Sequence, residues 1–470
     1  MFLCREKELE KLERRYKQGG LECIVIYGRR RVGKTALINE FVKNKPTIYF
    51  PALDTNAQGN LAALSGAIHS YRFPDAAAAP VYASFDLAFQ EITQIAKQSG
   101  RVVFVIDEYP YLAKADSSIP SRLQHLLDHD WADTNLFLIL CGSSMSFMED
   151  QVLSQKSPLF GRRTAQFRIE PLTYFESARF HPNLRPEENA LIYGITGGIP
   201  HYINKLDVHT TIREALLENL FDPSSYLFEE TGILLRQELR EPALYNAVIT
   251  AVANGAARLN EISSRVGIEN AICAKYLQVL SELGIISKIE PVIGKTKKKT
   301  QYRITDNFFR FWYRFVPENM MAISSGSIVR TYDAVVGKYL SEYMGLIFEQ
   351  ICRQYLIYYI KEPPFPFRTI GEWWGTDPIQ KREAQLDIVA VGDKAERFAS
   401  GQNFLIGSCK YKNEQIGTDE LRLIQDYSAI FTSAKDDCFY YIFSKSGFTN
   451  GLKEQENAVN LLTLEDLYHL

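Results

Sequence analysis

The stretch from Gly28 to Thr35 constrains this chain more than any other, because it has the form G-x-x-x-x-G-K-T. An apolar run over residues 23–27 precedes it and predicts a buried strand, while residues 36–42 carry apolar side chains at helical spacing. A glycine-containing turn between a strand and a helix lets backbone N–H groups converge on phosphate oxygens. The sequence therefore predicts a phosphate-binding loop.

Each residue type in this loop has a chemical reason. Gly28 and Gly33 permit the tight turn, and Lys34 is expected to reach the β- and γ-phosphates of a nucleotide. The Thr35 hydroxyl is expected to take a place on Mg²⁺, and the positive end of the following helix attracts the same anion. The predicted contacts of the nucleotide are Gly28, Arg29, Arg30, Arg31, Val32, Gly33, Lys34, Thr35 and Ala36.

A second apolar run, residues 102–106, ends in the two carboxylates of Asp107 and Glu108. Ligands collect at the carboxyl ends of buried parallel strands. We expect Asp107 to hold Mg²⁺ through water and Glu108 to orient and activate the attacking water. Acidic residues after a strand are also common as helix caps, which is the alternative for this pair.

A third apolar run, residues 136–141, ends in Gly142-Ser143-Ser144. A hydroxyl here, which we assign to Ser143, would lie between the phosphate-binding loop and Glu108 and could sense the γ-phosphate. An ordinary turn rich in glycine and serine is the alternative. The three runs, in this order and with polar ends, predict an α/β fold of the P-loop NTPase type with a doubly wound parallel sheet.

Two arginines precede another predicted strand over residues 166–169. Arg162 or Arg163 could act as an arginine finger on the charge of the transition state, either in cis or from a neighbouring subunit. Arginines are also common on protein surfaces without any such role. We list both as candidate catalytic residues beside Lys34 and Glu108.

The composition of the whole chain argues against several classes of protein. A net charge of −3 over 470 residues gives no general basic surface for coating nucleic acid. The seven cysteines are scattered without a C-x-x-C pair, which favours reduced thiols and a cytoplasmic address over structural zinc. No apolar run approaches the roughly 20 residues of a membrane helix, so no membrane association is expected. A homo-oligomer is left open.

Residues 241–306 show three helical segments and then two strands that flank a lysine-rich tip, a pattern typical of a winged helix. The lysines of the tip could contact phosphates of nucleic acid, which would give salt-dependent binding indifferent to base sequence. They could also do no more than keep the hairpin soluble. These lysines are Lys295, Lys297, Lys298 and Lys299.

Five stretches together resemble the archaeal-type P-loop ATPases of the AAA+/STAND class, which carry a C-terminal domain of unknown function. The stretches are Tyr27–Thr35, Val105–Tyr109, Gly142–Ser144, Gly197–Pro200 and Asp306–Phe315. The resemblance extends over nearly the whole chain and implies ATP and Mg²⁺ as ligands. It also implies a lid and a winged helix packed on the ATPase core, with the winged helix often serving the nucleotide switch rather than DNA.

From about residue 337 the predicted elements follow the order α-β-β-β-α-β, with Asp387 and Lys410 on neighbouring strands. This order resembles the restriction-endonuclease-like fold, whose nucleases hold Mg²⁺ between an Asp and the Glu of an E-x-K motif. Ser408 stands where the family has that Glu and offers only a weak neutral oxygen. Three acidic residues could in principle supply the missing charge: Glu349, Glu383 and Glu414. We expect a degenerate domain with a vestigial nuclease site at Glu349, Asp387 and Lys410.

The sequence thus predicts a cytoplasmic, Mg²⁺-dependent switch ATPase that binds ATP and ADP. An ATP-regulated DNA or RNA nuclease and a non-catalytic DNA-binding regulator are the alternatives. The predicted parts are a P-loop ATPase core over 1–170, a helical lid over 171–240, a winged helix over 241–306, a helical connector over 307–336 and a restriction-endonuclease-like domain over 337–470.

Overall fold

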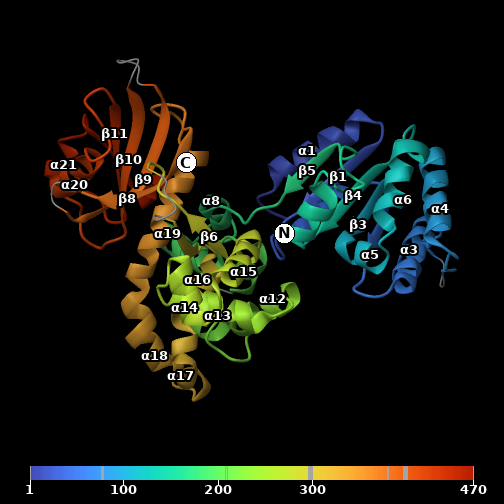
Figure 1. Ribbon diagram of the computed structural model, residues 1–470, viewed down its shortest axis with the longest axis horizontal. Helices are drawn as coiled ribbons and strands as arrows, with labels where there is room; N and C mark the ends of the chain where they lie inside the picture. Colours follow the sequence, from blue (N-terminus) through green and yellow to red (C-terminus); the bar gives the residue numbers. More distant parts are fainter. Residues whose placement is uncertain are drawn as a thin grey trace. The chain divides into compact units, whose positions relative to one another are not determined.

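The computed structural model describes residues 2–75, 79–206, 208, 210–294, 300–377, 381–394 and 401–468. The chain divides into two compact units, which Figure 1 shows in colours that follow the sequence. Unit 1 comprises Met1–Pro171 and Ile199–His201, and unit 2 comprises Leu172–Gly198 and Tyr202–Leu470. The predicted lysine tip, with Lys295, Lys297, Lys298 and Lys299, lies outside the described residues.

The described part of unit 1 contains a five-stranded parallel sheet with the strand order β2-β3-β4-β1-β5. This confirms the predicted P-loop NTPase fold. Every residue of β1, β3 and β4 is buried, as continuous apolar runs in a doubly covered parallel sheet require. The strands are β1 (Glu22–Tyr27), β2 (Thr47–Pro51), β3 (Val103–Asp107), β4 (Phe137–Gly142) and β5 (Ala165–Arg168).

Helices cover both faces of this sheet and bury two separate apolar layers (Figure 1). One layer joins the sheet to α1 (Glu6–Gln18) and α2 (Lys34–Val42), and includes Leu12 and Phe41. The other joins it to α3 (Ala57–Arg72), α4 (Phe85–Gln98), α5 (Tyr109–Ala115) and α6 (Ile119–His125). The sequence analysis did not predict α3 and α4.

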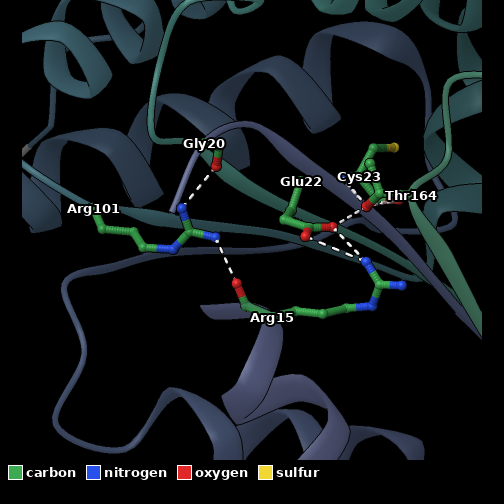
Figure 2. Close-up of polar contacts among 6 residues, drawn as sticks. All are labelled: Arg15, Gly20, Glu22, Cys23, Arg101 and Thr164. Atoms are coloured by element: carbon green, nitrogen blue, oxygen red, sulfur yellow. Dashed lines mark hydrogen bonds and ion pairs between the residues drawn. The ribbon is translucent and has the colours of Figure 1, made fainter. Parts of the chain in front are cut away.

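A buried carboxylate holds α1 against the amino end of β1, as Figure 2 shows. Glu22 accepts two hydrogen bonds from Arg15 of α1 and one from the Thr164 hydroxyl. Arg101 donates to the carbonyls of Gly20 and Arg15 and so closes the same corner. This network lies at the amino end of β1, whereas the predicted phosphate-binding loop follows its carboxyl end, so we interpret it as a structural anchor.

Unit 2 begins with helices, as predicted for the lid, and these are broken at Gly197 and Gly198, both with positive φ. A side chain at Gly198 would place its Cβ 2.0 Å from the carbonyl oxygen of Leu172, which explains the glycine. The lid role itself stays a prediction. The helices are α8 (Tyr174–Ala178), α9 (Pro186–Thr196), α10 (Pro200–Lys205), α11 (Ile212–Asn219) and α12 (Tyr226–Glu238).

Three helices and an antiparallel hairpin follow, in the order that predicted a winged helix. They are α13 (Pro242–Ala253), α14 (Leu259–Val266), α15 (Asn270–Glu282), β6 (Ile286–Ile289) and β7 (Gln301–Ile304). The aromatic segment over 306–315 forms α16 (Asn307–Phe315), which Asp306 caps by accepting a hydrogen bond from the Phe309 N–H. Two short helices, α17 (Met320–Ser324) and α18 (Ile328–Thr331), lead to α19 (Gly337–Tyr358).

The C-terminal part contains a second five-stranded sheet among the described residues, in the order β12-β11-β10-β9-β8. Strands β8, β9 and β10 pair antiparallel, while β10, β11 and β12 pair parallel. The elements are β8 (Thr369–Thr376), β9 (Glu383–Lys394), β10 (Gln402–Lys410), α20 (Thr418–Ser428), β11 (Asp437–Ser444), α21 (Asn450–Lys453), β12 (Val459–Thr463) and α22 (Leu464–Tyr468). The sequence analysis missed β12, α21 and α22.

Within the described ranges, no helix combines the length and the apolar character needed to cross a lipid bilayer. The longest, α19, has 22 residues but carries several charged side chains.

Candidate nucleotide site and C-terminal carboxylate centre

The backbone of the Gly28–Thr35 loop adopts a conformation that few other sequences could follow. Gly28 has φ +154° and Gly33 has φ +96°, both in the region that favours glycine. A Cβ on Gly28 would lie 2.3 Å from the carbonyl oxygen of Ile169, the residue that follows β5. Arg31 also has a positive φ of 72°. The glycines are therefore required by close approach of the backbone as well as by its torsion angles.

Lys34 begins α2 and turns its ammonium back into the loop. Its Nζ donates to the carbonyl oxygens of Gly28 at 2.8 Å and Arg29 at 2.9 Å. Burial lowers the pKa of Lys34, although Asp107 and Glu108 oppose that shift. Among the described residues no carboxylate forms an ion pair with Lys34. A buried ammonium held only by neutral carbonyls is matched to an incoming phosphate.

Asp107 ends β3 at the same edge of the sheet, and its carboxylate accepts several hydrogen bonds. Its Oδ2 accepts from the hydroxyls of Thr35, at 3.2 Å, and Tyr49, at 2.7 Å. Its Oδ1 accepts from the N–H of Glu108 at 3.0 Å. Carboxylate and hydroxyl oxygens are the hard ligands that Mg²⁺ prefers, so Thr35 and Asp107 fit such an ion. Tyr49 was not among the predicted site residues, because a single tyrosine in a strand gives no local sign that it will contact Asp107.

Glu108 stands between β3 and α5 in the left-handed region, with φ 52° and ψ 44°. Its Oε2 accepts from the Ser143 hydroxyl at 2.9 Å and from the Ser143 N–H at 3.3 Å. Glu108 stands at the N-cap position of α5, but its side chain makes no capping hydrogen bond to that helix. Strained backbone at a residue with a held carboxylate is typical of functional sites. The structure thus brings Ser143, from the end of β4, to Glu108.

Arg30 within the loop and Arg5 before α1 also help to hold the loop in place. Arg30 donates to the Tyr111 hydroxyl of α5 at 2.8 Å. The buried Arg5 donates to the carbonyl oxygens of Val32, at 3.2 Å, and Glu170, at 2.5 Å. From the sequence, residues 5–17 could form either a lid near the adenine base, with Arg5 and Glu6 at its entrance, or a solvated helix with an apolar stripe, and Arg5 is not among the predicted nucleotide contacts.

The two finger candidates make their contacts elsewhere in unit 1. Arg162 pairs with Asp128 through two hydrogen bonds of 2.9 Å, and this hydrogen bonding raises the pKa of Arg162. Arg163 donates to the carbonyl oxygen of Leu153 at 3.0 Å. The finger role therefore stays a prediction for both, and it would require Arg162 to leave Asp128.

In unit 2, four side chains meet around the predicted vestigial nuclease site. Lys410 Nζ lies 3.8 Å from Asp387 Oδ2 and 3.2 Å from Glu420 Oε1. The buried Ser408 hydroxyl donates to Glu420 Oε1 at 2.7 Å and lies 3.5 Å from Asp387 Oδ2. Ser408 and Lys410 share one face of β10, as the two-residue spacing predicted. Glu420 comes from the first turn of α20.

Glu420 is the carboxylate that the sequence analysis missed at this centre. Of the three proposed substitutes, Glu383 and Glu414 are exposed, whereas Glu349 of α19 is largely enclosed. Burial, followed by Asp387 and Glu372, raises the pKa of Glu349 to about 8. Burial also raises the pKa of Asp387, against the opposing effect of Lys410. In the sequence, the one feature that could have drawn attention to Glu420 is its place at the start of the helix predicted after the strand of Lys410.

The fit of a metal ion differs between the two sites. At the phosphate-binding loop, Thr35 and Asp107 present two oxygen ligands beside a buried lysine. At the C-terminal centre, Lys410 lies between Asp387 and Glu420. Nowhere in the ranges that the structure describes do three or more His, Cys, Asp or Glu side chains cluster in a way that could hold a metal.

Comparisons with known proteins agree with this architecture. Residues 2–206 match a family described as an ATPase domain predominantly from Archaea, and residues 312–422 match one described as archaeal and bacterial proteins of unknown function. An uncharacterized protein of Methanocaldococcus jannaschii is 32% identical over 400 residues, which cover 84% of this chain and 86% of that protein. An uncharacterized ATP-binding protein of the same organism is 53% identical over 45 residues, 10% of this chain and 76% of its own length.

Among solved structures, the Walker-type ATPase of Pyrococcus abyssi has a TM-score of 0.53 at 20% sequence identity. That similarity covers 67% of this chain and 96% of the Pyrococcus protein, and it supports the fold. The relative that covers 84% of this chain and the family model over residues 2–206 carry the family assignment. This chain therefore belongs to the family of P-loop ATPases found predominantly in Archaea, with a C-terminal region known from archaeal and bacterial proteins of unknown function.

Proposed function

We propose that this protein is a Mg²⁺-dependent switch ATPase that binds ATP and hydrolyses it to ADP. The observation that carries the proposal is the pairing of Glu108 with Ser143 beside an unpaired, buried Lys34. These groups come from β3, β4 and α2, whose ends meet at one edge of the sheet. In this arrangement Lys34 could bind a phosphate group while Glu108 accepts a hydrogen bond from the attacking water.

In this proposal each residue has one task. Lys34 exchanges its bonds to the Gly28 and Arg29 carbonyls for bonds to phosphate oxygens. Mg²⁺, when bound near Thr35 and Asp107, would neutralise charge on the β- and γ-phosphates. Glu108 accepts a proton from the attacking water, and Ser143 keeps that carboxylate oriented. When Glu108 takes the attacking water as its partner, it would release its hydrogen bond from Ser143 at the end of β4. This change of partner would link hydrolysis to the position of β4, and it is the switch that we propose.

Two variants separate nucleotide binding from hydrolysis. Lys34→Ala should lose ATP affinity, because it removes a buried ammonium that points into the loop. Glu108→Gln should bind ATP normally and hydrolyse it about 100-fold more slowly or worse, as expected for loss of a general base. Glu10→Gln, on the exposed face of α1, is the matched control. Wild-type hydrolysis by Glu108→Gln would refute the assignment.

The position of Glu420 favours a second candidate function, an ATP-regulated nuclease that uses the C-terminal centre. Glu420 supplies a second carboxylate beside Asp387. The centre therefore contains two acids, although Ser408 stands where related nucleases have Glu. In that role Asp387 and Glu420 would hold a divalent metal ion, which would supply positive charge at the phosphate, and Lys410 would polarise the attacking water. Association with nucleic acid would follow from this activity.

The nuclease is tested by incubating the protein with plasmid, linear and single-stranded DNA, and with RNA, in Mg²⁺ and Mn²⁺. Cleavage that disappears in both Asp387→Asn and Glu420→Gln supports the activity. The control is Glu383→Gln, which removes an exposed carboxylate at the start of β9. Absence of cleavage with every substrate, or cleavage that both variants retain, rules the second function out.

A further inference from the structure

A cavity of about 650 Å³ lies within unit 2, apart from the residues assigned above to the nucleotide. Its walls come from the end of α13, from β6 and β7, and from one face each of α16 and α19. Binding pockets for small molecules have volumes of roughly 300–1,000 Å³. The cavity is therefore large enough for a mononucleotide.

Charged groups of both signs line this cavity, and the cations outnumber the anions. Two of the cations, Arg310 and Arg314, belong to the aromatic segment over 306–315 and lie one helical turn apart on α16. With every carboxyl group ionised, four guanidinium groups face three carboxylates, which leaves an excess of one positive charge. The lining arginines are Arg303, Arg310, Arg314 and Arg353, and the lining acids are Glu342, Glu349 and Glu372.

The arginines that line the cavity differ in how closely they pair with carboxylates. Glu372 is shared by Arg303, at 2.6 Å, and Arg353, at 3.3 Å. Arg314 has a looser pair with Glu342, at 3.5 Å, and both of these side chains are well exposed. Because Glu372 is shared by two arginines and the Arg314–Glu342 pair is long and exposed, the arginines can still bind an anionic ligand.

Arg310 is the least compensated of the four. Its Nε donates to the carbonyl oxygen of Ile304 at 2.8 Å, and its Nη2 donates to the same oxygen at 2.5 Å. In the part of the chain that the structure describes, no carboxylate forms an ion pair with this guanidinium. Glu349 and Glu372 act on this half-buried guanidinium without a direct ion pair, so an anion that enters the cavity and bonds Arg310 directly would stabilise it.

The remaining walls suit the rest of a nucleotide. Val252, Ala256 and Ile289 provide apolar surface, and Tyr302 provides an aromatic ring. Planar guanidinium groups bind phosphate oxygens in pairs, which Lys cannot do. Aromatic and apolar side chains are the usual partners of a base.

We propose that this cavity is a second nucleotide site, which binds a nucleoside phosphate with its phosphate group on Arg310 and Arg314. The phosphate group belongs either to a free mononucleotide or to the 5′-phosphorylated end of an oligonucleotide. Since the shared chemistry is the nucleoside monophosphate, the experiment uses both sources. The proposal does not depend on hydrolysis at the phosphate-binding loop.

The test uses the full-length protein with Lys34→Ala, which keeps nucleotide off the phosphate-binding loop. Fluorescently labelled AMP and a labelled, 5′-phosphorylated tetranucleotide are titrated separately, and fluorescence anisotropy reports binding. At least one probe should bind saturably and be displaced by unlabelled AMP. Adding Arg314→Gln should weaken binding at least tenfold, and adding Arg310→Gln should weaken it at least as much.

Arg258→Gln is the control, since Arg258 is an exposed arginine at the start of α14 that does not line the cavity. It should leave the affinity unchanged. Arg310→Gln removes a bond to Ile304 and can destabilise the fold, so Arg314→Gln, at a half-exposed position, decides the outcome if Arg310→Gln does not fold. No saturable binding of either probe, or binding that Arg314→Gln leaves unchanged, overturns the proposal.

Discussion

The Ser143 hydroxyl donates to Glu108 Oε2 over 2.9 Å and joins the ends of β4 and β3. The N–H of the same serine donates to the same oxygen at 3.3 Å. Glu108 has the left-handed backbone that aims its carboxylate at β4 rather than along α5. A backbone of this kind costs about 1–3 kcal/mol and persists where surrounding contacts maintain it.

Ser143→Ala should therefore reduce ATP hydrolysis without weakening ATP binding. Loss of a hydrogen bond to a charged group costs about 1.5–3 kcal/mol. We expect kcat to fall roughly 10- to 100-fold, since about 1.4 kcal/mol corresponds to a factor of ten. Steady-state kinetics and an equilibrium ATP titration measure the two effects. Ser144→Ala, which removes the neighbouring hydroxyl, should retain wild-type kcat; equal losses in both variants would contradict the assignment.

Tyr49→Phe should weaken the response to Mg²⁺ more than the binding of ATP. The Tyr49 hydroxyl donates to Asp107 Oδ2 at 2.7 Å and holds that carboxylate toward Thr35. Removing a partner that orients a metal ligand typically costs 10- to 100-fold in metal affinity. The measurement is ATPase rate against Mg²⁺ concentration at saturating ATP. The control is Tyr82→Phe, because Tyr82 is a partly exposed loop residue. If Tyr49→Phe needs no more Mg²⁺ than the wild type for half-maximal activity, Tyr49 does not orient the metal ligand Asp107.

Gly28→Ala should abolish nucleotide binding and lower the stability of unit 1. The added Cβ would lie 2.3 Å from the Ile169 carbonyl oxygen, a contact that only a backbone shift can relieve. We expect a loss of at least about 2 kcal/mol in the free energy of unfolding, in the range of backbone substitutions at incompatible positions. Gly66→Ala in α3 meets no atom within 4 Å and should leave the unfolding midpoint unchanged or higher. Chemical denaturation of both variants makes the comparison.

Glu349→Gln should stabilise the protein at alkaline pH. Burial raises the pKa of Glu349 to about 8 in the folded state, above its ordinary value in the unfolded chain. A carboxyl with a raised pKa favours folding at low pH, and this contribution is lost as pH rises from about 4.5 through 8. The loss is on the order of a few kcal/mol by pH 9.

Urea unfolding of wild type and Glu349→Gln at pH 6 and pH 9 tests that sign. The variant should lose less stability than wild type between the two values. Glu342→Gln, on an exposed position of the same helix, should follow the wild-type curve. Parallel pH dependences for wild type and Glu349→Gln would show that Glu349 titrates normally.

Much of unit 1 could be predicted from the sequence, because its signals are local. Continuous apolar runs read directly as buried strands, and the glycines at 28 and 33 specify their own torsion angles. Asp107 and Glu108 follow a strand end, where ligands gather in any parallel sheet. The helices α3 and α4 escaped prediction because their apolar spacing was not read, although both carry polar N-caps, Asn56 and Ser84.

The hydrogen-bond partners of Asp107 and Glu108 carry no such local signal, because each partner is distant in the sequence. Tyr49 meets Asp107 across 58 positions, and Ser143 meets Glu108 across 35. The strand order β2-β3-β4-β1-β5 decides both encounters, and no local pattern states that order. At the C-terminal centre, the sequence showed that Ser408 replaces a carboxylate and offered Glu349, Glu383 and Glu414 as substitutes. The packing of α20 on β10 brings a further carboxylate, Glu420, to that centre.

The sequence by itself determined the chemistry available to this protein: a phosphate-binding loop, an acidic strand end, and a nuclease-like pattern with one acid replaced. Tertiary structure alone decided which side chains share a charge environment, as with Glu349 and Asp387, or Arg310 and its cavity. The reason is physical. Torsion angles and apolar periodicity act over a few residues, whereas electrostatic and hydrogen-bonding partners are chosen by packing between segments far apart in the chain.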